Sequence, residues 1–205
     1  MVWRILVGLK DGVTDARGER VCREIRQHLG IELAAVRTLD VYTVDAQLSD
    51  ADIAAAAHGP FCDPVIQEVA INQPLDRDYD ISIEVGFRPG VTDNTGRTAK
   101  EAIQYLIDRP FAAEEGVYTS TLYLLKGLQD PQLAEQIAAD LLANGLIQRW
   151  TIAMAGDAVV DGAAKKGDLV EVFETIPPGR RRWHPRGGVF DLRSGGSWRP
   201  EDISC

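Results

Sequence analysis

Apolar and polar residues alternate in short runs along the first part of the chain, and they predict strands separated by amphipathic helices. Residues 2–10 carry an apolar side chain at every second position from Trp3 to Leu9, which is typical of a strand with one buried face. A helix follows, with apolar residues every fourth position. Asp15 is suited to cap its beginning and Gly30 to end it.

The same patterns predict a further series of strands and helices. Extended segments are expected at 33–45, 65–72, 80–88, 116–126 and 146–154, and helices at 49–58, 94–108 and 131–144. Strands that alternate with helices over such short units are typical of α+β folds. We therefore predict ferredoxin-like units, each with an antiparallel sheet and with its helices on one face.

The chain also repeats itself. Residues 7–18 (VGLKDGVTDARG) and 85–96 (VGFRPGVTDNTG) are identical at seven of twelve positions, at an offset of 78. Later segments match at an offset of 81: Val41-Tyr42 with Leu122-Tyr123, and residues 64–67 with 145–148. A collinear series of this kind over about 75 residues predicts a duplicated unit.

This repeat predicts the domain organisation. We expect a first unit at 1–75, a second at 79–155, and a linker or partly disordered tail at 156–205. A unit of about 75 residues is only marginally stable alone, so we expect the two units to pack as a pseudo-dimer.

Composition limits the classes of function. Asp and Glu number 31 against 22 Lys and Arg, a net charge of −9, which disfavours a nucleic-acid partner. Residues 176–205 differ, with six Arg and three acidic residues. No apolar run approaches the roughly 18 residues of a membrane span. Three cysteines, an odd number, fit a reducing compartment, so a cytoplasmic protein is expected.

The residues 88–98, between a strand and a helix, form the most polar motif. A glycine turn could offer backbone N–H groups to a phosphate, but neither standard nucleotide-binding spacing is present. A tight turn with a helix cap is the favoured interpretation. Polar residues here, at the matching first-half positions and at position 37 are candidates for contact with a partner: Lys10, Arg17, Arg37, Arg88, Thr92, Asn94, Thr95 and Arg97.

Catalytic and metal-binding patterns are not recognisable. His28, His58 and His184 are scattered, and Gly59-Pro60 separates His58 from Cys62, so a helical metal face is disfavoured. No Cys or Ser is placed with a His and an acid in a known local signature. We expect no catalytic residue, metal site or cofactor in this chain.

Three segments resemble the small PurS subunit of phosphoribosylformylglycinamidine (FGAM) synthase, an enzyme of purine synthesis. Residues 9–18 resemble that family's Lys-x-Gly-Val-x-Asp-x-x-Gly turn. Residues 36–42 resemble its Val-Arg-x-x-Lys-Tyr strand, although Asp40-Val41 departs from it. Residues 141–147 resemble its Leu-Leu-Ala-Asn-Pro-Val-Ile junction. The tandem arrangement resembles the N-terminal region of those PurL synthetases to which two PurS-like units are fused.

The resemblance implies a role without chemistry of its own. A PurS subunit holds the synthetase (PurL) and the glutaminase (PurQ) together so that ammonia passes between them. ATP and magnesium are then expected on the partner synthetase. Three other possibilities stay open: a homodimer, a ligand-sensing domain pair with a polar pocket between its units, and an RNA-binding module. The acidic charge disfavours the last of these.

Overall fold

A computed structural model describes residues 1–76, 78–156, 182–183 and 189–190 of the 205. The chain divides into two units, residues 1–166 and 167–205. In the second unit, two short strands, β7 (Arg182–Trp183) and β8 (Val189–Phe190), pair in antiparallel orientation. Apart from these strands and residue 156, the predicted tail at 156–205 lies outside the described residues.

The described residues of the first unit form six strands and four helices, close to the expected positions. The strands are β1 (Val2–Leu9), β2 (Ala35–Asp45), β3 (Gln67–Ile71), β4 (Ile81–Phe87), β5 (Gly116–Lys126) and β6 (Gln148–Met154). The helices are α1 (Ala16–Leu29), α2 (Asp50–His58), α3 (Asn94–Ile107) and α4 (Pro131–Ile137), and a π-helical turn, η1 (Ala138–Leu142), continues α4.

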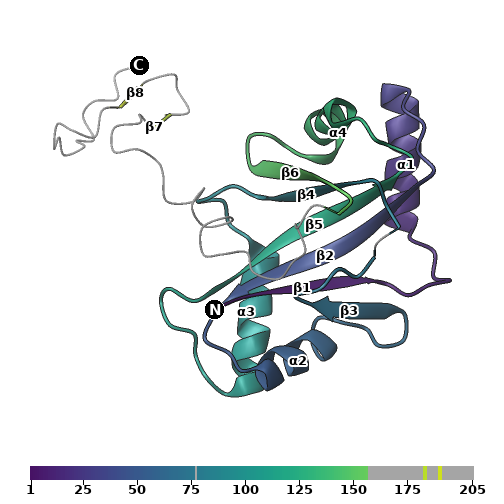
Figure 1. Ribbon diagram of the computed structural model, residues 1–205. Coiled ribbons are helices and arrows are strands. Elements are labelled where there is room, and N and C mark those ends of the chain that lie inside the picture. The colour runs from purple at the N-terminus through teal and green to yellow at the C-terminus, as the bar shows by residue number, and fades with distance from the viewer. Residues whose placement is uncertain (77, 157–181, 184–188, 191–205) are drawn as a thin grey trace. The chain divides into compact units, whose positions relative to one another are not determined.

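The six strands form one antiparallel sheet in the order β3-β1-β2-β5-β4-β6 (Figure 1). The predicted α+β class is confirmed. The sheet is continuous between the halves, where one sheet per half was expected. This difference arises because β2 and β5 pair along all eleven residues of each strand, from Ala35 opposite Lys126 to Asp45 opposite Gly116.

Strand register is the same in the two halves. Ile5 of β1 lies opposite Tyr42 on one side and Ile71 on the other. In the second half, Ile83 of β4 lies opposite Tyr123 and Ile152. These residues differ by the offsets of 78 and 81 found in the sequence.

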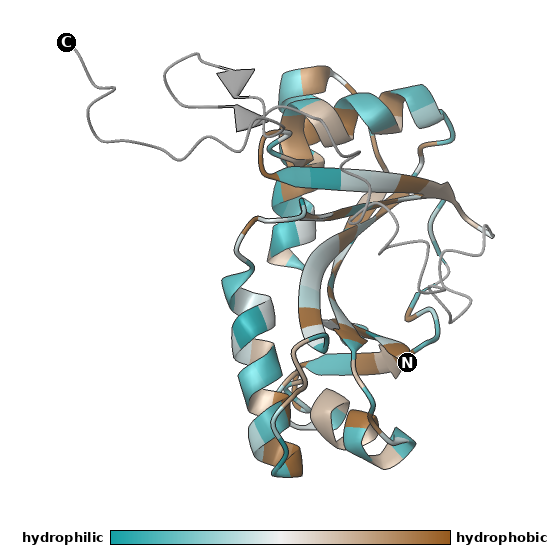
Figure 2. Cartoon of the chain, turned by 90° about the vertical axis from the view of Figure 1, so that its left-hand side faces the viewer, coloured by the Kyte–Doolittle hydropathy of each residue, from teal (hydrophilic) through white to brown (hydrophobic). Residues whose placement is uncertain are grey.

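All four helices cover one face of the sheet. In Figure 1, α2 and α3 lie at the edge of the sheet formed by β1 and β3, and α1 and α4 lie at the edge formed by β4 and β6. Ala99 and Ile103 of α3 join a buried cluster with Ile5 and Ile53, whereas Ile25 of α1 joins the cluster around β4 and α4. Helix α1 of the first half therefore packs over strands of the second half, and α3 of the second half packs over strands of the first half. The outer side of α3 is largely polar (Figure 2).

The opposite face carries a smaller apolar cluster. Five buried residues form it, against which two residues of the connection between β3 and β4 pack: Leu6, Leu39, Val41, Leu122 and Leu124, with Leu75 and Tyr79. Beside it, the buried guanidinium of Arg4 lies 2.7 Å from the Glu84 carboxylate, which also accepts a hydrogen bond from Ser120. This ion pair links β1 to β4 across the centre of the sheet.

Within the described residues, none of the helices has the length and apolar character needed to cross a bilayer.

Candidate partner-binding surface

The repeated glycine motif forms the same turn in both halves. The Val13 N–H donates to the Lys10 carbonyl at 3.0 Å, and the Val91 N–H donates to the Arg88 carbonyl at 3.1 Å. Gly12 has φ +84° and Gly90 has φ +81°, values that favour glycine at the third position of such a turn. The motif reverses the chain tightly between strand and helix.

The aspartate three residues before the end of each motif caps the helix and holds it to a central strand. Asp15 accepts hydrogen bonds from the Gly18 N–H at 2.8 Å and from the Thr38 N–H at 2.6 Å. Asp93 does the same with Gly96 and Thr119, at 2.7 and 2.6 Å. Both carboxylates are therefore engaged inside the fold as helix caps.

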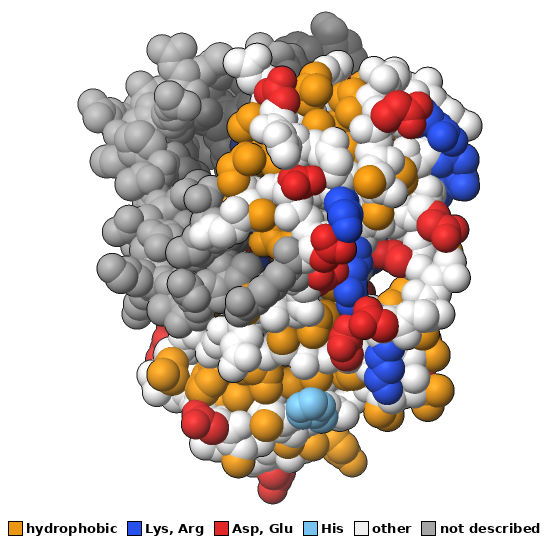
Figure 3. All heavy atoms as spheres, turned by 45° about the vertical axis from the view of Figure 1, so that its right-hand side comes forward, with side chains coloured by type: hydrophobic (Ala, Val, Ile, Leu, Met, Phe, Trp, Pro, Cys, Tyr) orange, Lys and Arg blue, Asp and Glu red, His pale blue; other side chains and the backbone are white. Residues whose placement is uncertain are grey.

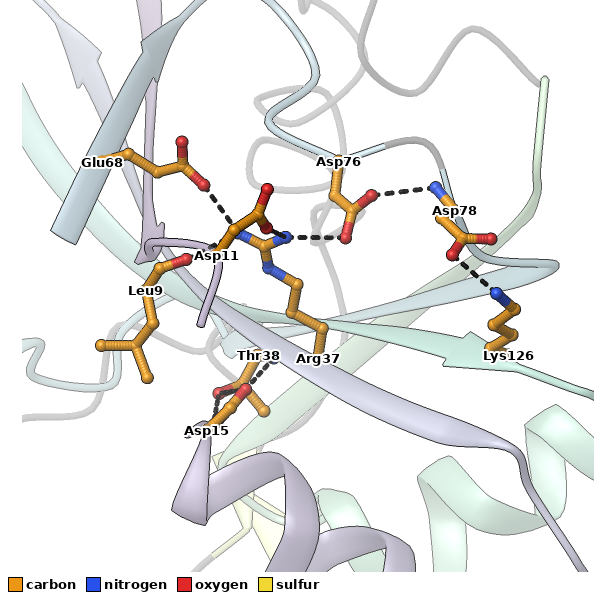
Figure 4. A network of polar contacts seen from close by, with 9 residues as sticks. All are labelled: Leu9, Asp11, Asp15, Arg37, Thr38, Glu68, Asp76, Asp78 and Lys126. Carbon is orange, nitrogen blue, oxygen red and sulfur yellow. Dashed lines mark hydrogen bonds and ion pairs between the residues drawn. The ribbon is translucent and has the colours of Figure 1, made fainter. Parts of the chain in front are cut away.

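Arg37 is the centre of an ion-pair network that holds the end of β1, β3 and the following connection together (Figure 4). Its guanidinium donates to the Leu9 carbonyl at 2.7 Å, to Glu68 at 2.8 Å and to Asp76 at 2.9 Å. Asp11 lies 3.9 Å away. With these partners Arg37 fixes the fold locally, so any contact with another protein would have to compete with them.

Arg17 is held in a similar way. It donates to the Thr38 hydroxyl and to the Asp40 carboxylate, both at 2.8 Å. The matching second-half positions are occupied by Thr95, Thr119 and Thr121, so this ion pair belongs to the first half alone. On the side of the molecule that Figure 3 shows, basic side chains lie beside acidic ones.

The eight predicted contact residues fall into two groups. Lys10, Arg17 and Arg37 lie near the end of β1. The other five follow β4 and are exposed, namely Arg88, Thr92, Asn94, Thr95 and Arg97; Arg97 pairs with Glu101 at 3.3 Å. Because β1 and β4 run in opposite directions across the sheet, the two groups lie at opposite ends and do not form one site.

Two exposed loops with the same construction lie where strands were expected to begin. We call residues 63–67 the first tip and residues 144–148 the second tip. In the first tip, the Val65 N–H donates to the Asp63 side chain and the Asp63 N–H to the Gln67 side chain, both at 2.8 Å. The Gln67 N–H donates a hydrogen bond to the Asp63 carbonyl at 2.8 Å.

The second tip repeats these bonds. Leu146 donates to the Asn144 side chain at 3.0 Å, Asn144 to the Gln148 side chain at 2.9 Å, and the Gln148 N–H to the Asn144 carbonyl at 2.7 Å. The sequence analysis assigned the apolar residues here to strands. A sequence signal for these loops does exist. Each has an Asp or Asn four positions before a Gln, namely Asp63 before Gln67 and Asn144 before Gln148, and such side chains can close a turn.

One pocket of about 440 Å³ lies between α1 and the chain that leads into β2. All its lining residues fall within residues 19–36, including Arg23, Arg26 and Glu32. The ligand-sensing alternative requires a pocket between the halves, which this pocket does not provide. Among the described residues, no three His, Cys, Asp or Glu side chains gather in a way that could hold a metal ion.

The fold and the sequence can both be compared with those of known protein families. The fold is that of an α+β protein with a six-stranded antiparallel sheet, helices on one face and similar exposed loops at its two ends. Residues 2–73, from β1 through β3, match the family model of PurS, phosphoribosylformylglycinamidine (FGAM) synthase. Residues 2–73 are therefore similar to PurS, as the sequence predicts. No curated protein matches the chain.

Proposed function

We propose that the chain is a non-catalytic component of FGAM synthase that holds the synthetase (PurL) and the glutaminase (PurQ) together for ammonia transfer. The match of residues 2–73 to the PurS family supports association with other subunits of that enzyme. The identity of those subunits, and the absence of chemistry in this chain, are taken from the resemblance to PurS.

We further propose that residues 79–155 are a second PurS-like unit. This proposal is carried by the strand register, which is the same in the two halves. Ile5 lies between Tyr42 and Ile71 on the neighbouring strands, and Ile83 lies between their counterparts, Tyr123 and Ile152. The paired helix-capping aspartates and the paired tips support it independently, since both depend on side-chain contacts at the predicted offsets.

In this proposal the two units form a pseudo-dimer joined between β2 and β5. Asp40 lies opposite Thr121, its own counterpart at the offset of 81. In an isologous two-fold contact, a residue next to the axis meets its own copy. The pairing of Asp40 with Thr121 therefore supports a pseudo-two-fold axis at this point of the sheet.

The role can be tested by reconstitution. The full chain is mixed with separately purified PurL and PurQ of the same organism, and complexes are isolated by size-exclusion chromatography. FGAM formation is then followed with glutamine as the nitrogen donor, with and without the chain. We expect a complex of all three proteins and glutamine-dependent activity only when the chain is present.

Free ammonium provides the control. Because ammonium reaches the synthetase from solution, its use as the nitrogen donor does not require the glutaminase to be held nearby. We expect ammonium-dependent activity to be the same with and without the chain. An absence of complex, together with unchanged glutamine-dependent activity, would show that the assembly role is wrong.

A further inference from the structure

The first and second tips present apolar side chains to solvent. Val65 is 77% exposed and Leu146 is 87% exposed, and the neighbouring Ile66 and Ile147 are each 42% exposed. A single exposed apolar residue is ordinary on a protein surface. Here two adjacent apolar residues are exposed in each loop, at equivalent positions of the two halves.

Both tips are held in shape before any partner binds. Besides the hydrogen bonds within each loop, the Lys10 N–H donates to the Ile66 carbonyl and the Arg88 N–H to the Ile147 carbonyl, at 3.0 and 2.9 Å. These bonds fix each tip to the residue that follows β1 or β4. A loop already ordered loses little conformational freedom on binding, so its apolar side chains are suited to act as anchors.

Each tip also has a cation at its base. The Lys10 ammonium donates to the Pro64 carbonyl at 2.5 Å, and the Arg88 guanidinium donates to the Gln148 carbonyl at 2.9 Å. Both side chains belong to exposed residues on a protein of net charge −9. The second tip contains no acidic residue, so its complementary surface is an apolar pocket with carboxylates at its rim. The first tip contains the exposed Asp63 beside the residue that Lys10 contacts, so its complementary surface is an apolar pocket without an acidic rim.

The two tips lie at opposite ends of the sheet. They lie beside the C-terminal ends of β1 and β4, and these strands run in opposite directions because three successive antiparallel pairings separate them. One small binding site cannot take both tips. This geometry favours a bridge between two bodies, one at each end.

We propose that the two tips are the docking points of the chain, each inserting its apolar side chain into an apolar pocket on a different subunit of FGAM synthase, with carboxylates at the rim of the pocket that faces Arg88. This inference rests on the function proposed above and specifies the surface through which it acts. The tips differ in residue, Val65 with Lys10 against Leu146 with Arg88, so each can select its own partner.

The test uses the full chain with Val65→Ser or Leu146→Ser. Each protein is immobilised, and its affinity for purified PurL and for purified PurQ is measured separately by biolayer interferometry. Losing an apolar side chain that is buried in the complex is expected to weaken binding by about tenfold. We expect Val65→Ser to affect one subunit and Leu146→Ser the other.

Tyr105→Ser provides the matched control, because Tyr105 is 91% exposed on α3, away from both tips. It should bind both subunits as the unchanged chain does. Arg88→Gln should weaken binding only to the subunit that Leu146→Ser affects, and should reduce the salt dependence of that binding. Circular dichroism melting verifies that all variants remain folded.

The outcomes separate the two proposals. If the unchanged chain binds and both tip variants bind PurL and PurQ equally well, the docking inference is wrong and the assembly role stands. If both variants lost binding to the same subunit, the assignment of one subunit to each tip would also be wrong. If the unchanged chain binds neither subunit, the proposed function and this inference both fail.

Discussion

Gly18 and Gly96 show at the scale of single residues why the repeated motif ends in glycine. Each lies in the first turn of a helix that crosses a central strand. A Cβ atom at Gly18 would come within 2.2 Å of the Val36 carbonyl oxygen, and one at Gly96 within 2.5 Å of the Val117 carbonyl oxygen. Because backbone oxygens cannot move aside as a flexible side chain can, only glycine allows this approach of helix and strand.

Gly96→Ala is therefore expected to destabilise the protein. The added methyl group must push α3 away from β5, at a cost of about 1–3 kcal/mol in the free energy of unfolding. Urea denaturation followed by circular dichroism measures this change. Gly145→Ala is the control, because no atom lies within 4 Å of the added methyl group there. Equal stabilities of the two variants would contradict the steric argument.

Glu115 joins three elements of the fold. Its buried carboxylate accepts hydrogen bonds from the Arg109 guanidinium, after α3, at 3.0 Å, from the Gln47 N–H, after β2, at 2.7 Å, and from the Ala112 N–H at 2.8 Å. The Arg109 hydrogen bond, followed by the two backbone hydrogen bonds, lowers the pKa of Glu115 from 4.5 to about 2. The ionised carboxylate thus stabilises the contact between the halves.

Stability should depend on pH through this group. Since its pKa is lowered in the folded state, the stabilisation is complete above pH 4.5 and is lost as the pH falls through about 2. Glu115→Gln should lower the free energy of unfolding by about 2 kcal/mol near neutral pH, with a smaller difference in acid. Urea denaturation at several pH values measures it.

Glu114→Gln is the matched control for this pH series, because Glu114 is exposed and next to Glu115. It should leave the stability nearly unchanged at each pH. A difference between Glu115→Gln and the unchanged chain that stays constant from neutral to acid pH would contradict the assigned role.

The elements themselves were largely predictable, since period-two and period-four patterns, with helix caps, locate the described strands and helices of the first unit. The contact between β2 and β5 was not, because an eleven-residue antiparallel pairing over so many intervening residues leaves no local signal. The tips were missed for a related reason. Val65 and Leu146 continue an apolar run, whereas the turn depends on side-chain to backbone hydrogen bonds of Asp63 and Asn144. Of the proposed contact residues, Lys10 and Arg88 were found by matching the repeats.

At the scale of the whole molecule, the halves depend on each other. Ile25 of α1 is fully buried, in a cluster with Ile81 and Ile83 of β4, and β2 pairs with β5 along its whole length. Residues 1–75 alone would expose that side of α1 and the long edge of β2. We expect this fragment to be a dimer when folded, with the second copy in the place of residues 79–155.

Asp40 makes this fragment dimer testable. Two copies joined as the halves are joined would place Asp40 opposite Asp40, and like charges directly opposite each other weaken strand pairing. Asp40→Thr restores the residue that the intact chain has at position 121 and should strengthen dimerisation. Analytical ultracentrifugation of both fragments measures this. A stable folded monomer would show that the halves are independent domains.

The opposite directions of β1 and β4 have a consequence for stoichiometry. A dimer of identical subunits has two equal ends, so it recruits the same partner twice and can form longer assemblies. A single chain whose ends differ, with Val65 and Lys10 at one and Leu146 and Arg88 at the other, is saturated by one copy of each of two partners. In the proposed complex, this chain with its two different ends would therefore fix both the ratio of the bound subunits and their order along the sheet.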